Sequence, residues 1–134
     1  MEILAYPYRT FLTCSMRLEE LQVYQLAMLI GDEIWRIVDD WSYFVKDAFG
    51  KQLIRSADSI AANIAEGYGR YHYKENLNFC YYSRGSLKET VTWLTKALNR
   101  NLISWEKFTE LNHLCELLSV KLNNYIKTIG NGSR

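Results

Sequence analysis

Proline is nearly absent from this sequence of 134 residues, and its absence limits the fold more than any other feature of composition. The only proline is Pro7, so residues 8–134 contain none. Proline breaks helices because it lacks an amide hydrogen and clashes with the preceding turn. Long uninterrupted helices are therefore favoured, and no convincing two-residue alternation of apolar and polar residues predicts a strand.

Cysteine, long apolar runs and excess charge are also scarce. The three cysteines, Cys14, Cys80 and Cys115, are too few and too scattered for a disulfide framework or a paired-cysteine zinc site. We interpret them as buried thiols in a reducing cytoplasm. No apolar run approaches the roughly 20 residues that cross a bilayer, so no membrane association is expected. The 16 basic residues nearly cancel the 15 acidic ones, which argues against a general nucleic-acid binder with a strongly basic field.

The first 15 residues differ from the rest of the chain. A regular helical pattern begins only after Met16, and the opening segment lacks the basic start and continuous apolar core of a signal peptide. We predict a loosely held arm at residues 1–15 and one helical domain at residues 16–134. With 49% hydrophobic residues, a chain of this length can bury a core.

Four segments carry apolar residues at helical spacing, over about residues 18–40, 47–66, 72–99 and 104–129. Asp47 and Ser104 are the predicted N-caps of the second and fourth segments, and Gly130 is predicted to close the fourth. The predicted seam of the third is Leu77, Cys80, Leu87, Val91, Leu94 and Leu98, with Arg84 on it. The fourth carries a heptad of Phe108, Leu111, Cys115, Leu118, Leu122, Tyr125 and Ile129. Short links place neighbouring helices antiparallel, so the sequence predicts an all-α, up-down-up-down antiparallel four-helix bundle.

The stretch ADSIAANIAEGYGRY, residues 57–71, combines small residues with polar ones that would be costly to bury unpaired. We expect a partly buried network between the second and third helices, formed by Arg55, Asp58, Asn63, Glu66, Arg84 and Glu89. Gly85 and Ser86 indicate close packing against the second helix, because a mid-helix glycine costs about 1 kcal/mol relative to alanine. Gly67 is expected as a left-handed C-cap and, with Gly69, to end the second helix.

Catalytic chemistry has little support in the sequence. No nucleophile and base stand out as a pair, and two histidines give little from which to build a triad. Gly-Tyr-Gly lacks the Lys-Ser/Thr ending of a phosphate-binding loop. Glu110 and His113 form the Glu-x-x-His pair of di-iron bundles, but the second pair is missing because the only other histidine is His72. We predict no catalytic residue, metal or cofactor; a small-molecule or metal site inside the bundle is the alternative.

The segment GYGRYHYKENLNFCYYSRG interleaves tyrosines with basic residues, a mixture that can stack on bases and pair with phosphates. The candidate contacts with a nucleic acid or another partner are Arg70, Tyr71, His72, Lys74 and Lys88. A structural interpretation stays open, because tyrosines at helical spacing commonly pack in a core or an interface.

Two stretches, QLIRSADSIAANIAEGYGRY and KENLNFCYYSRGSLKET, together resemble the signature of a bacterial four-helix-bundle family. The founding members of that family are encoded by intervening sequences within 23S ribosomal RNA genes. Here the order Arg-x-x-x-Ser-Ile-x-x-Asn-Ile-Ala-Glu-Gly runs from Arg55 to Gly67, and the similarity covers about residues 18–129. Family members often carry a proline between the first two helices, where this chain has SYFV, so the conformation of that link stays open.

The resemblance implies a homo-oligomer, specifically a pentamer, because related bundles assemble as five-membered rings or barrels. It also implies RNA or DNA as a partner. A related accessory protein of diversity-generating retroelements binds a reverse transcriptase and is strongly basic; this chain has a net charge of +1, so that activity is not carried over. An aromatic surplus independently favours self-association, since a lone small bundle cannot easily bury Trp35, Trp41, Phe44, Phe49, Trp93 and Trp105. We expect a non-enzymatic interaction module.

Overall fold

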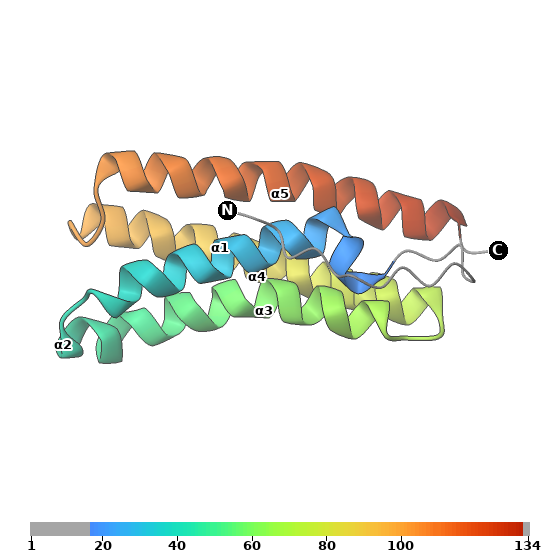
Figure 1. Cartoon of the computed structure of the whole chain (residues 1–134), viewed down its shortest axis with the longest axis horizontal. Helices are drawn as coiled ribbons and strands as arrows, with labels where there is room; N and C mark the ends of the chain where they lie inside the picture. Colours follow the sequence, from blue (N-terminus) through green and yellow to red (C-terminus); the bar gives the residue numbers. More distant parts are fainter. Residues whose placement is uncertain (1–16, 133–134) are drawn as a thin grey trace.

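The computed structural model describes residues 17–132, and within that range it contains four long helices and no strand (Figure 1). The long helices are α1 (Gln22–Asp39), α3 (Lys51–Tyr68), α4 (Tyr73–Asn99) and α5 (Trp105–Gly132). A 3-10 turn (Leu18–Glu20) precedes α1, while a short helix α2 (Tyr43–Val45) and a π-helical turn (Lys46–Gly50) lead into α3. The predicted all-helical class is confirmed. The predicted arm at residues 1–15 lies outside the described residues.

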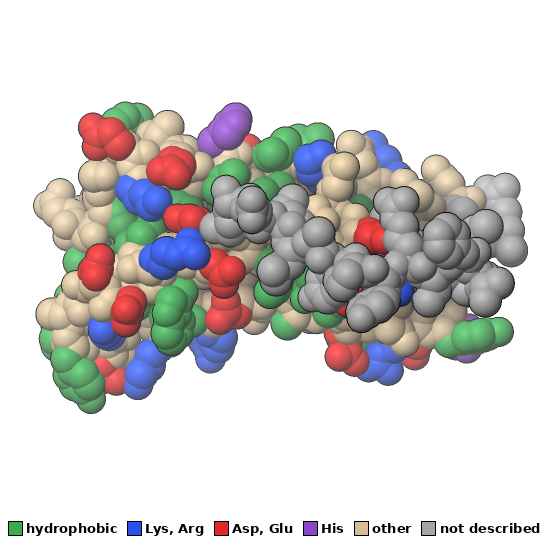
Figure 2. Space-filling view, in the orientation of Figure 1, with side chains coloured by type: hydrophobic (Ala, Val, Ile, Leu, Met, Phe, Trp, Pro, Cys, Tyr) green, Lys and Arg blue, Asp and Glu red, His purple; other side chains and the backbone are tan. Residues whose placement is uncertain are grey.

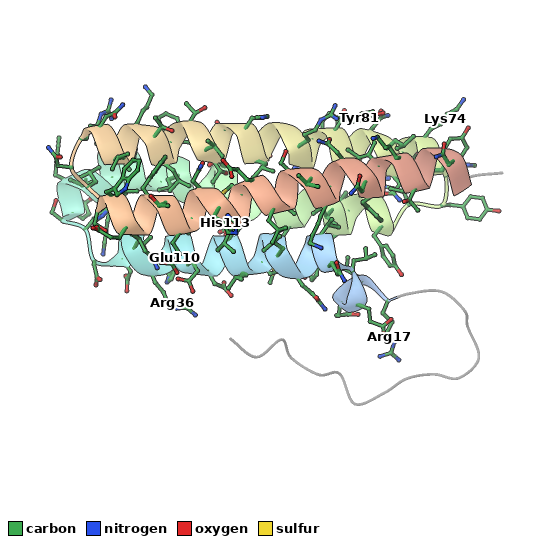
Figure 3. The ribbon with its side chains drawn as sticks, turned by 90° about the horizontal axis from the view of Figure 1, so that it is seen from above. Arg17, Arg36, Lys74, Tyr81, Glu110 and His113 are labelled. Atoms are coloured by element: carbon green, nitrogen blue, oxygen red, sulfur yellow. The ribbon has the colours of Figure 1, made fainter. Side chains whose placement is uncertain are left out.

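The helices pack side by side as a bundle. α1 packs against α3 and α5, and α4 packs against the same two helices. α1 and α4 therefore occupy opposite corners, and Figure 3 shows them at opposite edges of the molecule. The link after α1 and the link between α4 and α5 lie at the same end of the molecule (Figure 1). There the indole Nε1 of Trp41 donates a hydrogen bond of 3.1 Å to the carbonyl oxygen of Leu102.

The core is filled by aliphatic side chains from all four long helices. The largest fully buried aliphatic residues are Ile30, Ile34, Leu53, Ile60, Ile64, Leu87, Leu94, Leu111, Leu118 and Leu122. Burying one side chain of this size contributes about 1.5–3 kcal/mol. Apolar packing therefore dominates the stability of the interior. The hydroxyls of Ser56, Ser83 and Thr90 enter it with hydrogen-bond partners, whereas the buried Nε1 of Trp93 has none among the described residues.

Helix α4 uses a different seam from the one predicted. Its buried residues are Cys80, Ser83, Leu87, Thr90, Leu94 and Ala97. The prediction shares Cys80, Leu87 and Leu94 but is wrong about Arg84, which is exposed. Ser83 and Thr90 occupy core positions because their hydroxyls have acceptors on α3. Ser83 Oγ donates to the carbonyl of Ile60 at 2.8 Å, and Thr90 Oγ1 lies 3.1 Å from Ser56 Oγ.

Helix α5 follows its predicted heptad closely. Leu111, Cys115, Leu118 and Leu122 are buried, as expected for one continuous stripe. Ser104 is confirmed as the N-cap, since its Oγ accepts a hydrogen bond of 3.1 Å from the amide of Lys107. The helix extends to Gly132, beyond the predicted end at Gly130.

The link between α1 and α3 differs from the prediction. Ser42, not Asp47, caps the second helical segment, because its Oγ accepts from the amide of Val45 at 3.4 Å. Asp47 lies inside the π-helical turn and pairs with Lys51 at 2.5 Å. Gly50 allows this turn to approach α1, since a Cβ there would lie 2.7 Å from Val38 Cγ1.

Two glycines have roles opposite to those predicted. Gly67 is not a left-handed C-cap: α3 continues to Tyr68, and no described glycine has a positive φ. It is buried against α4, where an added Cβ would lie 2.9 Å from Phe79 Cβ and 3.0 Å from the carbonyl oxygen of Asn76. Gly85, predicted to pack closely, is exposed, and an added Cβ would meet nothing within 4 Å. The close contact between α3 and α4 is therefore at Gly67.

Candidate interaction surfaces

The polar side chains predicted to connect α3 with α4 bond mainly along their own helix. Arg55 donates to Gln52, and Asn63 Nδ2 donates to the carbonyl of Ser59 at 2.9 Å. Glu66 accepts from Arg70 at 2.7 Å.

Two members of the proposed network lie on α4 and also fail to join α3. Arg84 reaches another helix, but its partner is Asn123 of α5 at 3.2 Å. Glu89 is exposed. The expected network is therefore wrong: these long side chains stay near solvent, and the short hydroxyls of Ser56, Ser83 and Thr90 make the buried contacts between α3 and α4. Ser86 is half-buried, and its carbonyl accepts from Thr90 at 2.8 Å.

Asp58 faces α1, where Gly31 makes room for its carboxylate. Its Oδ1 lies 2.9 Å from the position of a Cβ added at Gly31. Partial burial, followed by the negative charge of Asp32, raises the pKa of Asp58. Neither carboxylate forms an ion pair within residues 17–132. Two negative charges therefore stand close together across α1 and α3 without a cation.

The candidate nucleic-acid contacts separate into two places. Arg70, Tyr71 and His72 lie in the short link between α3 and α4, and Lys74 lies in the first turn of α4. Figure 3 labels Lys74 at this end of the bundle. Tyr71 is 94% exposed and meets His72 edge to face, with ring centroids 5.0 Å apart. Lys88 follows Lys74 by about four turns of α4, or roughly 21 Å of helix. The structure thus groups four of the five candidates and excludes Lys88 from the group.

Three of the six aromatic residues that a lone bundle was not expected to bury are buried or half-buried: Trp41, Phe49 and Trp93. Phe49 packs against Trp41 and Trp93, with ring centroids 5.8 and 5.5 Å apart. Trp35, Phe44 and Trp105 stay outside, at 56%, 76% and 65% exposed. Other large apolar side chains on the surface are Met28, Tyr43, Tyr73, Tyr81, Tyr82, Leu117 and Val120. These residues lie outside a core that is already filled.

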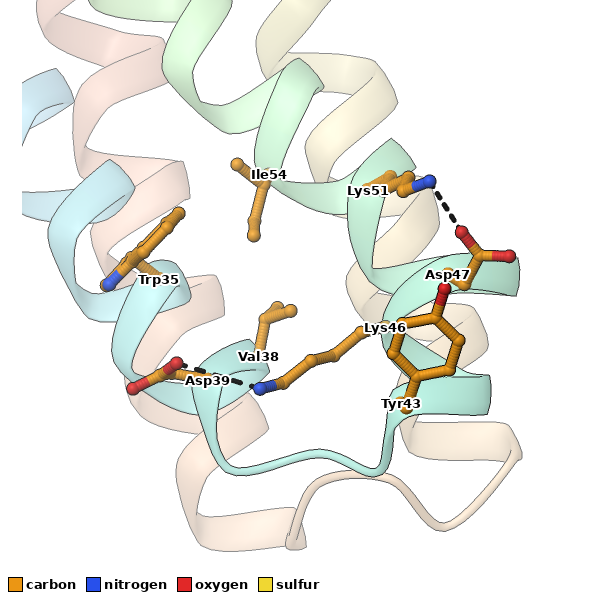
Figure 4. Close-up of a pocket in the computed structure, with 8 residues that line it drawn as sticks. All are labelled: Trp35, Val38, Asp39, Tyr43, Lys46, Asp47, Lys51 and Ile54. Atoms are coloured by element: carbon orange, nitrogen blue, oxygen red, sulfur yellow. Dashed lines mark hydrogen bonds and ion pairs between the residues drawn. The ribbon is translucent and has the colours of Figure 1, made fainter.

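A hollow of about 280 Å³ lies between α1, α2 and α3 (Figure 4). Its lining residues are Trp35, Val38, Asp39, Tyr43, Lys46, Asp47, Lys51 and Ile54. Both lysines are paired, Lys46 with Asp39 at 3.7 Å and Lys51 with Asp47 at 2.5 Å. The hydrogen bond to Asp47, more than any other interaction, raises the pKa of Lys51. With its charges paired, the hollow suits an apolar or aromatic group. The sequence did not indicate it, because the π-helical turn has no recognised motif.

The Glu-x-x-His pair borders a second hollow, of about 520 Å³, between α1 and α5. Lys107 Nζ lies 3.3 Å from Glu33 and 3.5 Å from Glu110, so both carboxylates have a cation nearby. His113 is exposed on the same rim (Figure 3). Among the described residues, no group of three His, Cys, Asp or Glu side chains is placed to hold a metal ion.

The buried thiols are poor nucleophiles at neutral pH. Burial raises the pKa of Cys80 to about 11, and burial together with Glu116 raises that of Cys115 to about 12. A reactive cysteine needs a lowered pKa, which is the opposite shift.

No charge of a single sign covers the face in Figure 2, where acidic and basic side chains are interspersed. The described helices include none long and apolar enough to cross a bilayer.

Comparison with known proteins identifies the family. The chain matches the family model described as 23S rRNA-intervening sequence protein over residues 19–124. Its fold resembles the crystal structure of a protein of unknown function from the S23 ribosomal protein family of Bacteroides thetaiotaomicron. The TM-score is 0.71 at 22% identity, covering 79% of this chain and 99% of that chain. No curated protein sequence matches. Because the family match spans most of the helical bundle, this chain belongs to the 23S rRNA-intervening sequence protein family.

Proposed function

We propose that this protein is a non-enzymatic helical bundle that self-associates and acts as an interaction module. One observation carries the proposal: large apolar side chains, among them Trp35, Phe44 and Trp105, remain on the surface although the core is filled. Contiguous exposed apolar patches mark interaction sites in soluble proteins, and the exposed rings of Trp35 and Tyr43 line the same hollow. Helices of 18 and 27 residues, α1 and α4, provide faces long enough for a standard interface.

The arrangement of the subunit supports assembly through different faces. We infer that the four helices alternate in direction, because residues 69–72 and 100–104 are short links between long helices. Copies that meet through two different faces close into a ring when the rotation between them permits. The family resemblance makes a pentamer the expected ring.

Light scattering of the purified protein tests self-association directly. The expected molar mass is a multiple of the 15.8 kDa chain. Trp35→Gln removes an exposed apolar contact and is expected to shift the mass toward 15.8 kDa. Glu116→Gln, which changes an exposed polar residue of α5, is the control. A wild-type chain that stays at 15.8 kDa at every concentration contradicts the proposal.

A second candidate function is nucleic-acid binding at the link into α4, favoured by the exposed ring of Tyr71 between Arg70 and Lys74. Stacking of one base on such a ring contributes about 1–3 kcal/mol, and phosphate contacts make binding depend on salt. Structured RNA should bind with an affinity that falls as salt rises, and Arg70→Glu with Lys74→Glu should weaken it. The control is Lys127→Glu on α5. Unchanged binding removes these residues from the interface.

A metal-dependent or small-molecule activity is the alternative to an interaction module. The hollow beside His113 is where such a ligand would be sought. Elemental analysis of the purified protein separates the two functions, because a stoichiometric metal overturns the non-enzymatic proposal.

We place the protein in the cytoplasm, in keeping with its two buried free thiols, Cys80 and Cys115.

A further inference from the structure

The two helices at opposite corners of the bundle carry opposite net charge. Helix α1 has three acidic residues, Asp32, Glu33 and Asp39, against Arg36. Helix α4 has four basic residues against two acidic ones: Lys74, Arg84, Lys88 and Lys96 against Glu75 and Glu89. In Figure 3, Lys74 and Tyr81 lie along one edge of the molecule and Arg36 along the opposite edge. The two helices are complementary in charge, yet they cannot meet within one copy.

The acidic face consists of Met28, Asp32 and Trp35 of α1 together with Asp58 of α3. Spacings of four and three residues place Met28, Asp32 and Trp35 on one side of α1. Met28 and Trp35 are exposed apolar residues on either side of Asp32. Asp58 is close enough to Asp32 to feel its charge, and in the part of the chain that the structure describes neither has an ion-pair partner. A cation from outside the chain would relieve their repulsion.

The α4 ridge consists of Tyr81, Tyr82, Gly85 and Lys88, all exposed near the middle of α4. Lys88 has no ion pair within the described range. Packing within the bundle does not require glycine at position 85, because an added Cβ meets nothing within 4 Å. A mid-helix glycine nevertheless costs about 1 kcal/mol relative to alanine. The missing side chain leaves the α4 backbone open to a large group between the tyrosines and Lys88.

We propose that the acidic face of one copy contacts the α4 ridge of the next copy. Trp35 packs on the open backbone at Gly85, and Lys88 supplies the cation that Asp32 and Asp58 lack. The charges favour a second copy as the occupant, because each copy carries both complementary surfaces on opposite sides. Such a contact is heterologous and repeats around a ring. The inference rests on the self-association proposed above and names the surfaces that make it.

Charge reversal and restoration test the pairing, with light scattering as the measurement. Asp32→Lys and Lys88→Asp should each shift the molar mass toward that of the 15.8 kDa chain. The double variant, Asp32→Lys with Lys88→Asp, should regain the wild-type mass, because the reversed charges attract again. Gly85→Gln should weaken assembly without unfolding the bundle, since its Cβ has open space. The controls are Glu116→Lys and Lys127→Glu, both exposed on α5, with helicity of every variant checked by circular dichroism.

The outcomes separate this inference from the proposed function. A monomeric wild-type chain overturns self-association itself. An oligomeric wild-type chain that tolerates both reversals and Gly85→Gln overturns the pairing of faces and leaves self-association standing. Loss of assembly in each reversal without recovery in the double variant also overturns the pairing. If Lys88→Asp abolishes RNA binding and leaves the mass unchanged, the α4 ridge is a nucleic-acid surface and the inference is wrong.

Discussion

Buried hydroxyl groups link α4 to α3. Thr90 Oγ1 lies 3.1 Å from Ser56 Oγ and 2.8 Å from the carbonyl of Ser86, while Ser56 Oγ donates to the carbonyl of Leu53 at 3.0 Å. Both side chains are almost fully buried. A buried hydroxyl without a partner is costly. Ser56 and Thr90 each have a backbone acceptor on their own helix, and the contact between the two hydroxyls adds a link between α3 and α4.

Single and double substitutions of Ser56 and Thr90 measure the energetic coupling between the two hydroxyls. Ser56→Ala and Thr90→Val should each lower the free energy of unfolding by about 1 kcal/mol. Because the two groups share a hydrogen bond, the double variant should differ from the sum of the single effects by about 0.5–1 kcal/mol. Urea unfolding provides the measurement. Thr95→Val, which removes an exposed hydroxyl on α4, is the control, and strictly additive effects would contradict the pairing.

The two buried thiols make stability depend on alkaline pH. The pKa of Cys80 is about 11 and that of Cys115 about 12 in the folded state, against 9.0 for an ordinary thiol. The folded chain keeps these protons when the unfolded chain loses them, so the free energy of unfolding should fall as pH rises above about 9. Urea unfolding at several pH values checks the direction. A Cys115→Ala variant should show a smaller dependence.

The same burial should also protect the thiols from alkylation. In a Cys14→Ser background, both remaining cysteines should react slowly with iodoacetamide in buffer and quickly in denaturing urea, because only the thiolate reacts. Fast modification of the folded chain would show that the interior is more open than the structure indicates.

At the scale of elements, two glycines near the end of α3 have different roles. Gly67→Ala should lower the free energy of unfolding by about 1–3 kcal/mol, because its Cβ would meet the α4 backbone at Asn76 and Phe79 Cβ. Gly69→Ala is the matched control, since its Cβ would lie 3.6 Å from the nearest atom, an ordinary contact. Thermal or urea unfolding compares the two. Equal effects would mean that both glycines only end the helix.

Local patterns in the sequence predicted the parts of the fold that depend on one helix alone. The heptad of α5 and the Ser104 cap are such features. The predicted seam of α4 omits Ser83 and Thr90, because these polar residues are expected at the surface until their acceptors on α3 are known. The prediction of a C-cap at Gly67 is wrong for the same reason, since its contacts with α4 cannot be inferred from the residues of α3 alone.

The candidate surfaces were harder to predict than the core. Arg70, Tyr71, His72 and Lys74 are consecutive or nearly so, and the sequence could group them. The acidic face joins Asp32 with Asp58, which lie on different helices, and no local pattern links them. The hollow beside Trp35 depends on the π-helical turn, where one added residue changes the path of the helix.

At the scale of the whole molecule, net charge alone gave little information. The chain as a whole carries +1, yet α1 and α4 are oppositely charged and stand at opposite corners. The net charge of the chain therefore does not describe how charge is distributed over the bundle.

The hydrogen bond from Trp41 to the Leu102 carbonyl links two segments that are far apart in the sequence, at one end of the bundle. The same end holds the aromatic contacts of Phe49 and the ring contact of Arg100 with Phe49 at 5.2 Å. Opening this end must break links between segments far apart in the sequence. Amide hydrogen exchange should therefore proceed more slowly near Leu94 than near Asn76, at the opposite end of α4. Trp41→Phe should reduce this difference in exchange rate between the two ends of α4. The bundle is therefore expected to open first at the end that holds Asn76.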